Sequence, residues 1–348
     1  MEVLARPGEV ALKTLGRLLL LLVLVAALTG YVFLLPYGPV AETFVDIPSG
    51  TGTPRIGALL EEHGIVRSRY GFDVLRLVKG GRLRAGEYRF DHRASMLEVY
   101  ARVVRGDVYT RTLVIPPGYN IFDIAQAVEE AGLGSRERFL AAERTHTELI
   151  RERSPRAASL EGFLFPDTYR FTRHATPEMM LTTMVHRWEK VTSQLAPEGP
   201  PSELAPGASM GAPGWGEIVT MASLIEKEVA DPKERPLVAG VFANRMRKGM
   251  PLQTDPSVIY AALLSGRYRG TIHASDLQFD SPYNTYRHAG LPPGPICNPG
   301  LASLRAALAP AKTEYLYFVS DGAGHSRFSA TMEEHARNVG SYRHTQGR

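Results

Sequence analysis

A glutamate inside a helical segment is the first candidate for acid–base chemistry in this sequence. The segment 215–230 (WGEIVTMASLIEKEVA) has apolar residues at helical spacing. The residues one helical turn from Glu226 are small or apolar, namely Ala222, Ser223, Val229 and Ala230. A carboxyl group desolvated by such a setting has a raised pKa, which a general acid needs near neutral pH. Glu226 is therefore a candidate general acid, although an ordinary glutamate at a helix boundary shows the same pattern.

Glu228 and the residues before a later helix form a second group of polar candidates. Glu228 stands next to the predicted helix end, so we expect it to reach solvent more easily than Glu226. Further on, Asp255 is followed by proline, the order of an N-cap and a first helical residue, which predicts a structural role for Asp255. Gln253 and Thr254 precede this cap, where exposed polar side chains can meet a ligand.

Two loop segments carry side chains that suit a sugar. The segment 280–296 (DSPYNTYRHAGLPPGPI) has almost no periodicity, and long loops of this kind are often functional. It offers hydrogen-bonding groups and flat apolar faces from Tyr283, Asn284 and Tyr286. The shorter segment 159–169 (SLEGFLFPDTY) places two carboxylates, Glu161 and Asp167, near aromatic residues.

Several other chemistries are disfavoured by the sequence. The ten histidines contain no H-x-x-x-H pair and Cys297 is the single cysteine, so we predict neither a metal site nor a disulfide. The G-x-S-x-G match at 207–211 is interpreted as accidental, because prolines flank it where a strand and a helix are needed. No phosphate-binding glycine loop occurs, so no nucleotide or other cofactor is expected. A net charge of +4 over 348 residues, without a dense basic run, disfavours nucleic acid as a partner.

The N-terminal region has the features of a membrane anchor. Residues 18–35 are uncharged and mainly apolar, and as a helix they would span about 27 Å. Basic residues precede this stretch, so the positive-inside rule predicts a cytoplasmic tail over 1–17. A cleaved signal peptide is the alternative, but no clear small-x-small cleavage site follows. We expect an uncleaved transmembrane helix, a linker over 36–44 and an extracytoplasmic body.

The rest of the chain has the pattern of an α+β protein in two regions. Its 44% hydrophobic and 22% charged residues exclude wholesale disorder. The segments 45–66 and 113–134 resemble each other at an offset of 68 residues, each as a strand, a Pro/Gly turn and a helix that ends at glycine. This order is similar to that of LysM-like modules, which bind amino-sugar glycans. We expect a LysM-like α+β region over 45–152, with a duplicated scaffold that makes no glycan contact as the alternative. A second α+β domain is expected over 153–348, with a Pro/Gly-rich loop at 196–214.

Five motifs in order give the chain a family resemblance. They are SLEGFLFPDTY (159–169), ASLIEKE (222–228), VFANRMRKGMPLQTDPSVIY (241–260), SPYNTYRHAGLPPGPICNPG (281–300) and YLYFVSDGAGHSRFS (315–329). With the anchor and the LysM-like region, they resemble the MltG/YceG-like family of endolytic murein (peptidoglycan lytic) transglycosylases from about Leu15 to His335. The resemblance implies a lyase that cleaves MurNAc–GlcNAc β-1,4 bonds within nascent peptidoglycan strands. It also implies 1,6-anhydro-MurNAc ends and so the termination of glycan elongation.

The resemblance further implies roles for individual residues. In this family one glutamate of the I-x-E-K-E-like helix is the catalytic acid/base, and it maps onto Glu226. One glutamate is sufficient because the C6 hydroxyl of the sugar attacks C1 in place of water. The groove for the glycan is expected to be lined by Gln253, Thr254, Ser281, Tyr283, Asn284, Tyr286 and Glu161. Structural roles near the site are expected for Asp255, Asp167 and Glu228.

The same resemblance predicts where the protein works and with what. We expect a single-pass inner-membrane protein whose catalytic domain lies in the periplasm, with peptidoglycan strands, the lipid bilayer and a peptidoglycan synthase as partners. A non-catalytic, membrane-anchored glycan-binding scaffold of the wall-synthesis machinery is the alternative function. A hydrolase is a third, in which products carry reducing ends and Glu161 or Asp167 acts as a second carboxylate.

Overall fold

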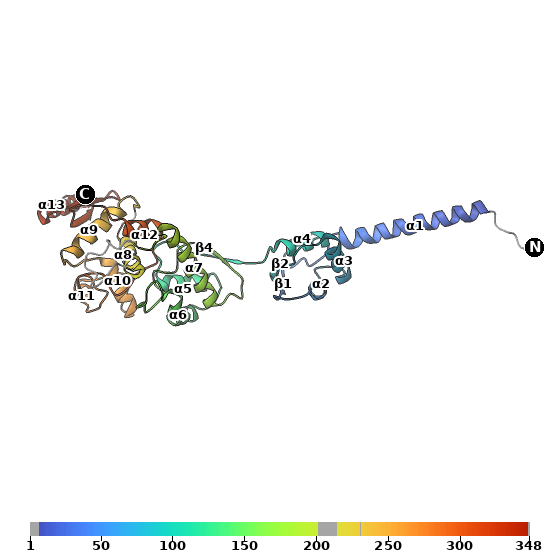
Figure 1. Cartoon of the computed structure of the whole chain (residues 1–348), viewed down its shortest axis with the longest axis horizontal. Helices are drawn as coiled ribbons and strands as arrows, with labels where there is room; N and C mark the ends of the chain where they lie inside the picture. The colour runs from blue at the N-terminus through green and yellow to red at the C-terminus, as the bar shows by residue number, and fades with distance from the viewer. Residues whose placement is uncertain (1–6, 201–213, 230, 347–348) are drawn as a thin grey trace, which may run out of the picture. The chain divides into compact units, whose positions relative to one another are not determined.

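The computed structural model describes residues 7–200, 214–229 and 231–346 (Figure 1). The chain divides into two compact units, Met1–Thr110 and Arg111–Arg348, and each is described by itself below. Both units combine helices with two-stranded antiparallel sheets, in agreement with the predicted α+β class. The G-x-S-x-G match at 207–211 lies outside the described residues.

The first unit begins with a long apolar helix, α1 (Pro7–Phe33). It contains a 20-residue stretch, Thr14–Phe33, with a mean hydropathy of 2.2 and no burial inside the protein. By length and composition this stretch can cross a membrane, as the sequence predicts for 18–35. The last turn of α1 is different, because Val32 and Phe33 pack against the apolar core of the unit.

A small domain follows α1. Its elements are β1 (Thr43–Ile47), α2 (Thr53–Glu62), α3 (Arg69–Lys79), β2 (Gly86–Phe90) and α4 (Met96–Arg105). β1 pairs antiparallel with β2, and the buried Val45 stands opposite the buried Tyr88. Ser95 caps α4 and forms a capping box with Glu98, which supplies two of the hydrogen bonds that a helix N-terminus lacks. The helices pack with this strand pair around a single apolar core.

The second unit is larger and mainly helical. Its elements are β3 (Arg111–Val114), α5 (Ile121–Glu130), α6 (Arg136–Thr145), η1 (Thr147–Ile150), β4 (Thr168–Phe171), α7 (Pro177–Leu195), α8 (Trp215–Glu228), α9 (Arg235–Arg247), α10 (Asp255–Leu264), α11 (Ala274–Leu277), α12 (Leu301–Leu308), β5 (Tyr317–Ser320), β6 (Ser326–Ser329) and α13 (Met332–Gln346). Two antiparallel pairs, β3 with β4 and β5 with β6, make its sheets.

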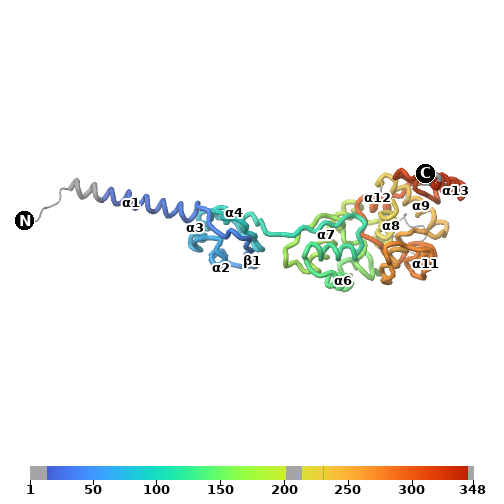
Figure 2. The backbone as a smooth tube through the Cα atoms, turned by 180° about the vertical axis from the view of Figure 1, so that it is seen from behind, coloured from blue at the N-terminus to red at the C-terminus, as the bar shows by residue number. Residues whose placement is uncertain are grey.

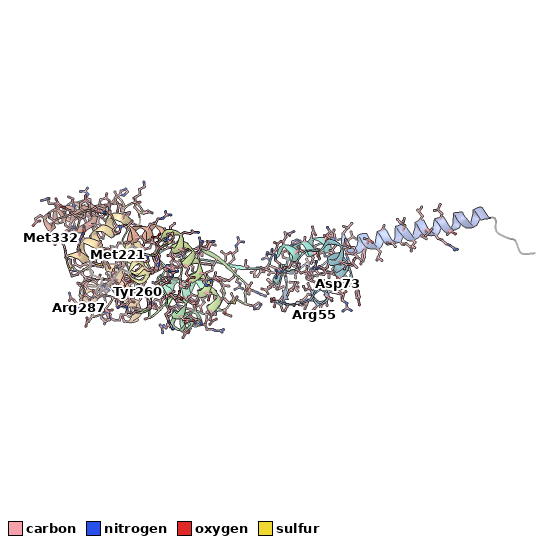
Figure 3. The ribbon with its side chains drawn as sticks, viewed as in Figure 1. Arg55, Asp73, Met221, Tyr260, Arg287 and Met332 are labelled. Atoms are coloured by element: carbon pink, nitrogen blue, oxygen red, sulfur yellow. The ribbon has the colours of Figure 1, made fainter. Side chains whose placement is uncertain are left out.

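Helix α8 lies at the centre of this unit. The sequence predicts one apolar stripe, but every residue from Ile218 to Ile225 is buried, so the helix is covered on all sides. Helices α9, α10 and α12 pack against it, and Figure 1 draws it among these three helices. Figure 2 shows it beside α9 and α12 from behind. Met221 of α8 and Tyr260 of α10, labelled in Figure 3, both belong to the buried apolar core of this unit. Because α8 is packed on all sides, the backbone that carries the side chains of its last turn has a fixed position.

The two similar segments have the same local structure. Each gives a strand, a glycine of positive φ and a ten-residue helix. A second glycine then ends each helix, Gly64 and Gly132, both with φ of 66°. The segments lie in different units, because β3 pairs with β4 and thereby ties 111–114 to the C-terminal unit. The unit boundary after Thr110 thus differs from the predicted division into 45–152 and 153–348, which follows the motifs rather than the strand pairing.

Other predicted elements are present with shifted ends. The helices predicted over 215–230 and 236–246 are α8 and α9. The prediction of Asp255 as N-cap is wrong by one residue, since Thr254 occupies the cap and Asp255 is the first helical residue of α10. The strand predicted as buried over 314–320 is shorter, β5, and its side chains are partly exposed because only β6 pairs with it.

Candidate active site

Glu226 lies in the last turn of α8, and both oxygens of its carboxylate are engaged. Oε1 accepts a hydrogen bond of 2.8 Å from Arg235 Nη2. Oε2 accepts one of 2.9 Å from the backbone N–H of Gly300 and a longer one of 3.4 Å from Arg235 Nη1. The side chains of Glu226 and Arg235 are only 5% and 11% exposed, so this is a buried ion pair. The apolar setting predicted for Glu226 is therefore wrong, because Arg235 at the start of α9 folds back onto it.

Glu228, two residues later, has the raised pKa that helical spacing suggested for Glu226, but its neighbours are charged and polar rather than apolar. It is the last residue of α8 and is partly buried. Burial and the negative charge of Asp255 raise the pKa of Glu228 to about 7, and the opposing charge of Arg245 offsets only part of this. A carboxyl group with this pKa holds its proton at neutral pH in half of the molecules, which suits a general acid.

Three residues from separate parts of the chain interact electrostatically with Glu228. Asp255 at the start of α10 accepts a hydrogen bond of 2.6 Å from the hydroxyl of Tyr286. The pKa of Tyr286 is raised by burial and by this hydrogen bond, with further contributions from the charges of Asp255 and Glu228. Arg245 of α9 interacts with both Glu228 and Tyr286. Glu228, Asp255, Tyr286 and Arg245 thus form one charged cluster, called here the Glu228 cluster.

Arg245 is held by backbone carbonyl groups rather than by an acid. Its Nε donates to Leu316 O at 2.7 Å, and its Nη1 donates to Leu252 O at 2.7 Å. The guanidinium lies 5.4 Å from the ring centroid of Tyr317. This side chain therefore connects the loop before α10 with β5 while its positive charge faces the Glu228 cluster. Arg245 carries no signal in the sequence that marks it as part of a site.

Gln253 stands beside the cluster in a strained conformation. It is the one described non-glycine residue with positive φ, at 53°. Its backbone N–H donates to Thr285 O at 3.1 Å, and its side chain is exposed. Strain of this kind is common at functional sites, where surrounding structure enforces it. The side chain of Gln253 is therefore exposed, as predicted, and its contact with a ligand stays a prediction.

Three of the predicted groove residues are instead buried inside the loops. Thr254 is buried and its N–H donates to Thr285 Oγ1 at 2.9 Å, so the prediction that it is exposed is wrong. Asn284 is fully buried and donates to the carbonyl oxygens of Leu277 and Phe279. Ser281 is also buried and accepts from the N–H of Tyr283. These side chains satisfy backbone groups and so shape the loop that carries Tyr286.

Tyr283 lines a cleft whose lining does not include Tyr286. It packs on Tyr260 with ring centroids 5.2 Å apart. It also lines a cleft of about 720 Å³ together with residues 153–159, the start of α8 and the proline-rich loop 291–295. A smaller hollow of about 370 Å³ lies beside the last turn of α8, lined by the loop 117–119, one face of α5 and Lys227.

Glu161 is not positioned to meet a ligand. Its side chain is 1% exposed and accepts hydrogen bonds from Ile121 N–H, the Tyr260 hydroxyl and Asn298 Nδ2 at 3.0, 2.9 and 2.9 Å. Burial raises the pKa of Glu161 to about 8. The predicted substrate-binding role is therefore replaced by a structural one, because Glu161 joins α5, α10 and the loop before α12. Asp167, at the start of β4, pairs with Arg187 at 2.6 Å.

One described group has the donor atoms of a metal site. Asp231, Glu234 and His325 bring their ligand atoms within 4.8 Å of one another. His325 Nδ1 lies 3.3 Å from Glu234 Oε1 and 3.7 Å from Asp231 Oδ2, distances that an ion pair with a protonated histidine also explains. No metal site is predicted from the sequence, because His325 is far from the two acids along the chain.

Comparison with known proteins finds one matching family and several similar proteins. Residues 45–341 match the model of the YceG-like family. An endolytic murein transglycosylase of Bacillus subtilis is 32% identical over 313 residues, covering 86% of this chain and 84% of the relative. One of Streptococcus pneumoniae (strain D39) is 31% identical over 327 residues, covering 86% of this chain and 58% of its own length. The crystal structure of a putative yceG-like protein from Listeria monocytogenes is 31% identical with a TM-score of 0.56, covering 86% of this chain and 99% of that one.

Proposed function

We propose, from the premise that this chain belongs to the YceG-like family, that it is an endolytic murein transglycosylase anchored in the membrane by α1. It cleaves MurNAc–GlcNAc β-1,4 bonds inside nascent peptidoglycan strands without water and leaves 1,6-anhydro-MurNAc ends. The N-terminus lies in the cytoplasm and the second unit acts on the far side of the membrane. Relatives over most of the chain that carry the name of this activity support the reaction class.

The acid of this reaction is Glu228 in our proposal, and one observation carries it. Two glutamates end α8, but Glu226 has both oxygens bound by Arg235 and Gly300. Glu228 has a pKa of about 7 from burial and the charge of Asp255. Both oxygens of Glu226 are already engaged by Arg235 and Gly300, so neither is free to meet a glycosidic oxygen. Glu228 thus takes the role that the sequence resemblance gave to Glu226.

One carboxyl group acts twice in this reaction, first as the general acid and then as the general base. Protonated Glu228 donates its proton to the glycosidic oxygen as the bond from C1 of MurNAc breaks. The resulting carboxylate then accepts the proton of the C6 hydroxyl as that oxygen bonds to C1, which returns Glu228 to its starting state. Attack from within the same sugar has a large effective molarity, so no second carboxylate is required to activate water.

Neighbouring residues have supporting roles in this scheme. Burial and the charge of Asp255 raise the pKa of Glu228, which favours its protonated form before the reaction, and Arg245 favours the carboxylate that appears after the first step. Tyr286 is fixed by Asp255 and offers a ring face for a sugar. Gln253 is exposed next to them and offers an amide for glycan hydroxyl groups.

The test compares the two glutamates in the full chain. Purified peptidoglycan strands are digested with wild type, Glu228→Gln and Glu226→Gln, and the products are analysed by mass spectrometry. We expect anhydro-ended fragments from wild type and a loss on the order of 10²–10⁴-fold in Glu228→Gln, with its circular dichroism unchanged. Glu226→Gln is expected to lose stability but to keep activity in its folded fraction. Full activity of Glu228→Gln would return the role to Glu226, whereas reducing-end fragments from wild type would identify a hydrolase.

A further inference from the structure

Helix α3 (Arg69–Lys79) has two apolar faces, and one of them points away from the protein. Phe72 and Leu75 are buried in the core of the first unit. On another side the exposed fractions are 66% for Tyr70, 52% for Val74, 88% for Leu77 and 75% for Val78. These four positions have the spacing i, i+4, i+7 and i+8, so they share one face of the helix. Four large side chains exposed on three turns form a contiguous apolar patch, and such patches mark sites of contact with a protein or a membrane.

This outward face begins beside the end of α1. A Cβ built on Gly71 would lie 3.0 Å from Val32 Cγ1, so α1 touches the first turn of α3. Arg67, just before α3, lies over the rings of Tyr31 and Tyr37, 4.3 and 4.5 Å from their centroids. It also donates a hydrogen bond of 3.2 Å to the Tyr31 hydroxyl. The views of the first unit draw α3 beside the same end of α1, with Asp73 of α3 labelled there (Figure 2 and Figure 3).

We propose that α3 lies in the lipid–water interface with Tyr70, Val74, Leu77 and Val78 inserted among the lipids. The inference rests on the membrane anchoring by α1 proposed above. If Thr14–Phe33 crosses the bilayer, Tyr31 and Tyr37 stand at the level where tyrosine is enriched, and α3 begins at that level. A bilayer is therefore within reach of this face by the geometry of the chain itself.

The charges on α3 favour a lipid surface over another protein. Arg69, Arg76 and Lys79 give three positive charges against the single negative charge of Asp73. Basic residues beside an apolar face are typical of interfacial helices, because they attract anionic headgroups while the apolar residues enter the acyl boundary. Such contact would fix the first unit against the membrane through two elements, α1 and α3, rather than through α1 alone.

The experiment uses the full chain in vesicles of phosphatidylcholine and phosphatidylglycerol. An environment-sensitive fluorophore is attached to Leu77→Cys on α3, in a Cys297→Ser background because the native cysteine is the single one in the chain. The matched control is Arg55→Cys on α2, an exposed position on the same unit. Lipid-borne quenchers should reduce the signal at position 77 at least about twofold more than at position 55, if position 77 enters the acyl boundary. Val74→Glu should remove most of this difference, since it places a charge in the inserted face.

Sedimentation with the vesicles separates failure of the inference from failure of the anchor. If the protein sediments with vesicles after alkaline washing and position 77 is as aqueous as position 55, α3 does not enter the lipid and the inference is overturned while the anchor stands. If the protein does not sediment, both are overturned. If position 77 is dehydrated but insensitive to lipid-borne quenchers, a protein covers this face and the lipid assignment is wrong.

Discussion

Arg235 Nη2 lies 2.8 Å from Glu226 Oε1, across the turn that joins α8 to α9, and this contact separates the roles of two neighbouring glutamates. Glu226 is bound by a cation and by the N–H of Gly300, whereas Glu228 faces the negative charge of Asp255. A nearby negative charge stabilises the neutral form of a carboxyl group, as it does for Glu228. The end of α8 therefore carries Glu226, which is held in an ion pair, and Glu228, the candidate acid.

The first prediction concerns pH. We expect kcat/KM on peptidoglycan strands to fall above pH about 7, because Glu228 must carry its proton to act as the acid. Asp255→Asn should move this limb to lower pH, since loss of the negative charge makes ionised Glu228 less unfavourable and lowers its pKa. A pH–rate profile measures both effects, with Asp46→Asn on β1 as a charge-matched control. An unmoved limb in Asp255→Asn would contradict the coupling of the two carboxyl groups.

The second prediction concerns stability at the same position. Burial raises the pKa of Glu228 from 4.5 to about 7, so the folded state binds a proton that the unfolded state releases. Stability is then lost as pH rises between these two values. Glu228→Gln should therefore stabilise the second unit by up to about 3 kcal/mol at pH 8 and by little at pH 4. Urea unfolding at the two pH values measures this, and an equal shift at both would argue against the raised pKa.

The third prediction concerns the ion pair of Glu226 with Arg235. Arg235→Met leaves a buried carboxylate without its cation, and we expect a loss of about 3–5 kcal/mol in the free energy of unfolding. The double variant Glu226→Gln with Arg235→Met should recover part of this loss, because neither charge is then left alone. Urea unfolding of the two single variants and the double variant completes the cycle. Additive losses would mean that the two side chains do not interact as the geometry indicates.

The fourth prediction uses the strained backbone of Gln253. Gln253→Gly removes the cost of a positive φ in a residue with a side chain, so the protein should gain about 1 kcal/mol of stability. It also removes the amide that we propose to bind glycan hydroxyl groups, so KM should rise while kcat changes less. Steady-state kinetics and thermal unfolding measure the two effects separately. A more stable variant with an unchanged KM would show that Gln253 does not contact the glycan.

The helices near the site could be predicted from the sequence because their signals are local. Apolar spacing and a terminal proline define α8, and short loops of glycine and proline define the ends of α9 and α10. The hairpin of β5 and β6 follows from a glycine turn between aromatic strands. The boundary between the two units is harder to predict from the sequence, because it depends on which strands pair across long stretches of the chain.

The choice between Glu226 and Glu228 could not be made from helical spacing. That spacing names the neighbours of a residue on its own helix, whereas Arg235 reaches Glu226 from the next helix after a turn. Thr254 and Asn284 illustrate the same point for loops, since polar side chains there satisfy buried backbone groups and only look exposed in the sequence. Which polar residues face a ligand is decided by packing across elements, and the sequence does not give this directly.

The end of α8 at Glu228 has an electrostatic consequence of its own. Val229 is in an extended conformation, so the helix stops there and the last carbonyl groups have no partners within it. Their aligned dipoles give a helix C-terminus the equivalent of about half a negative charge. A carboxylate at that end is repelled by the helix that carries it, and a proton there is retained. The C-terminus of α8 thus favours a protonated carboxyl group at this position. The N-terminus of the same helix would instead favour an ionised carboxylate.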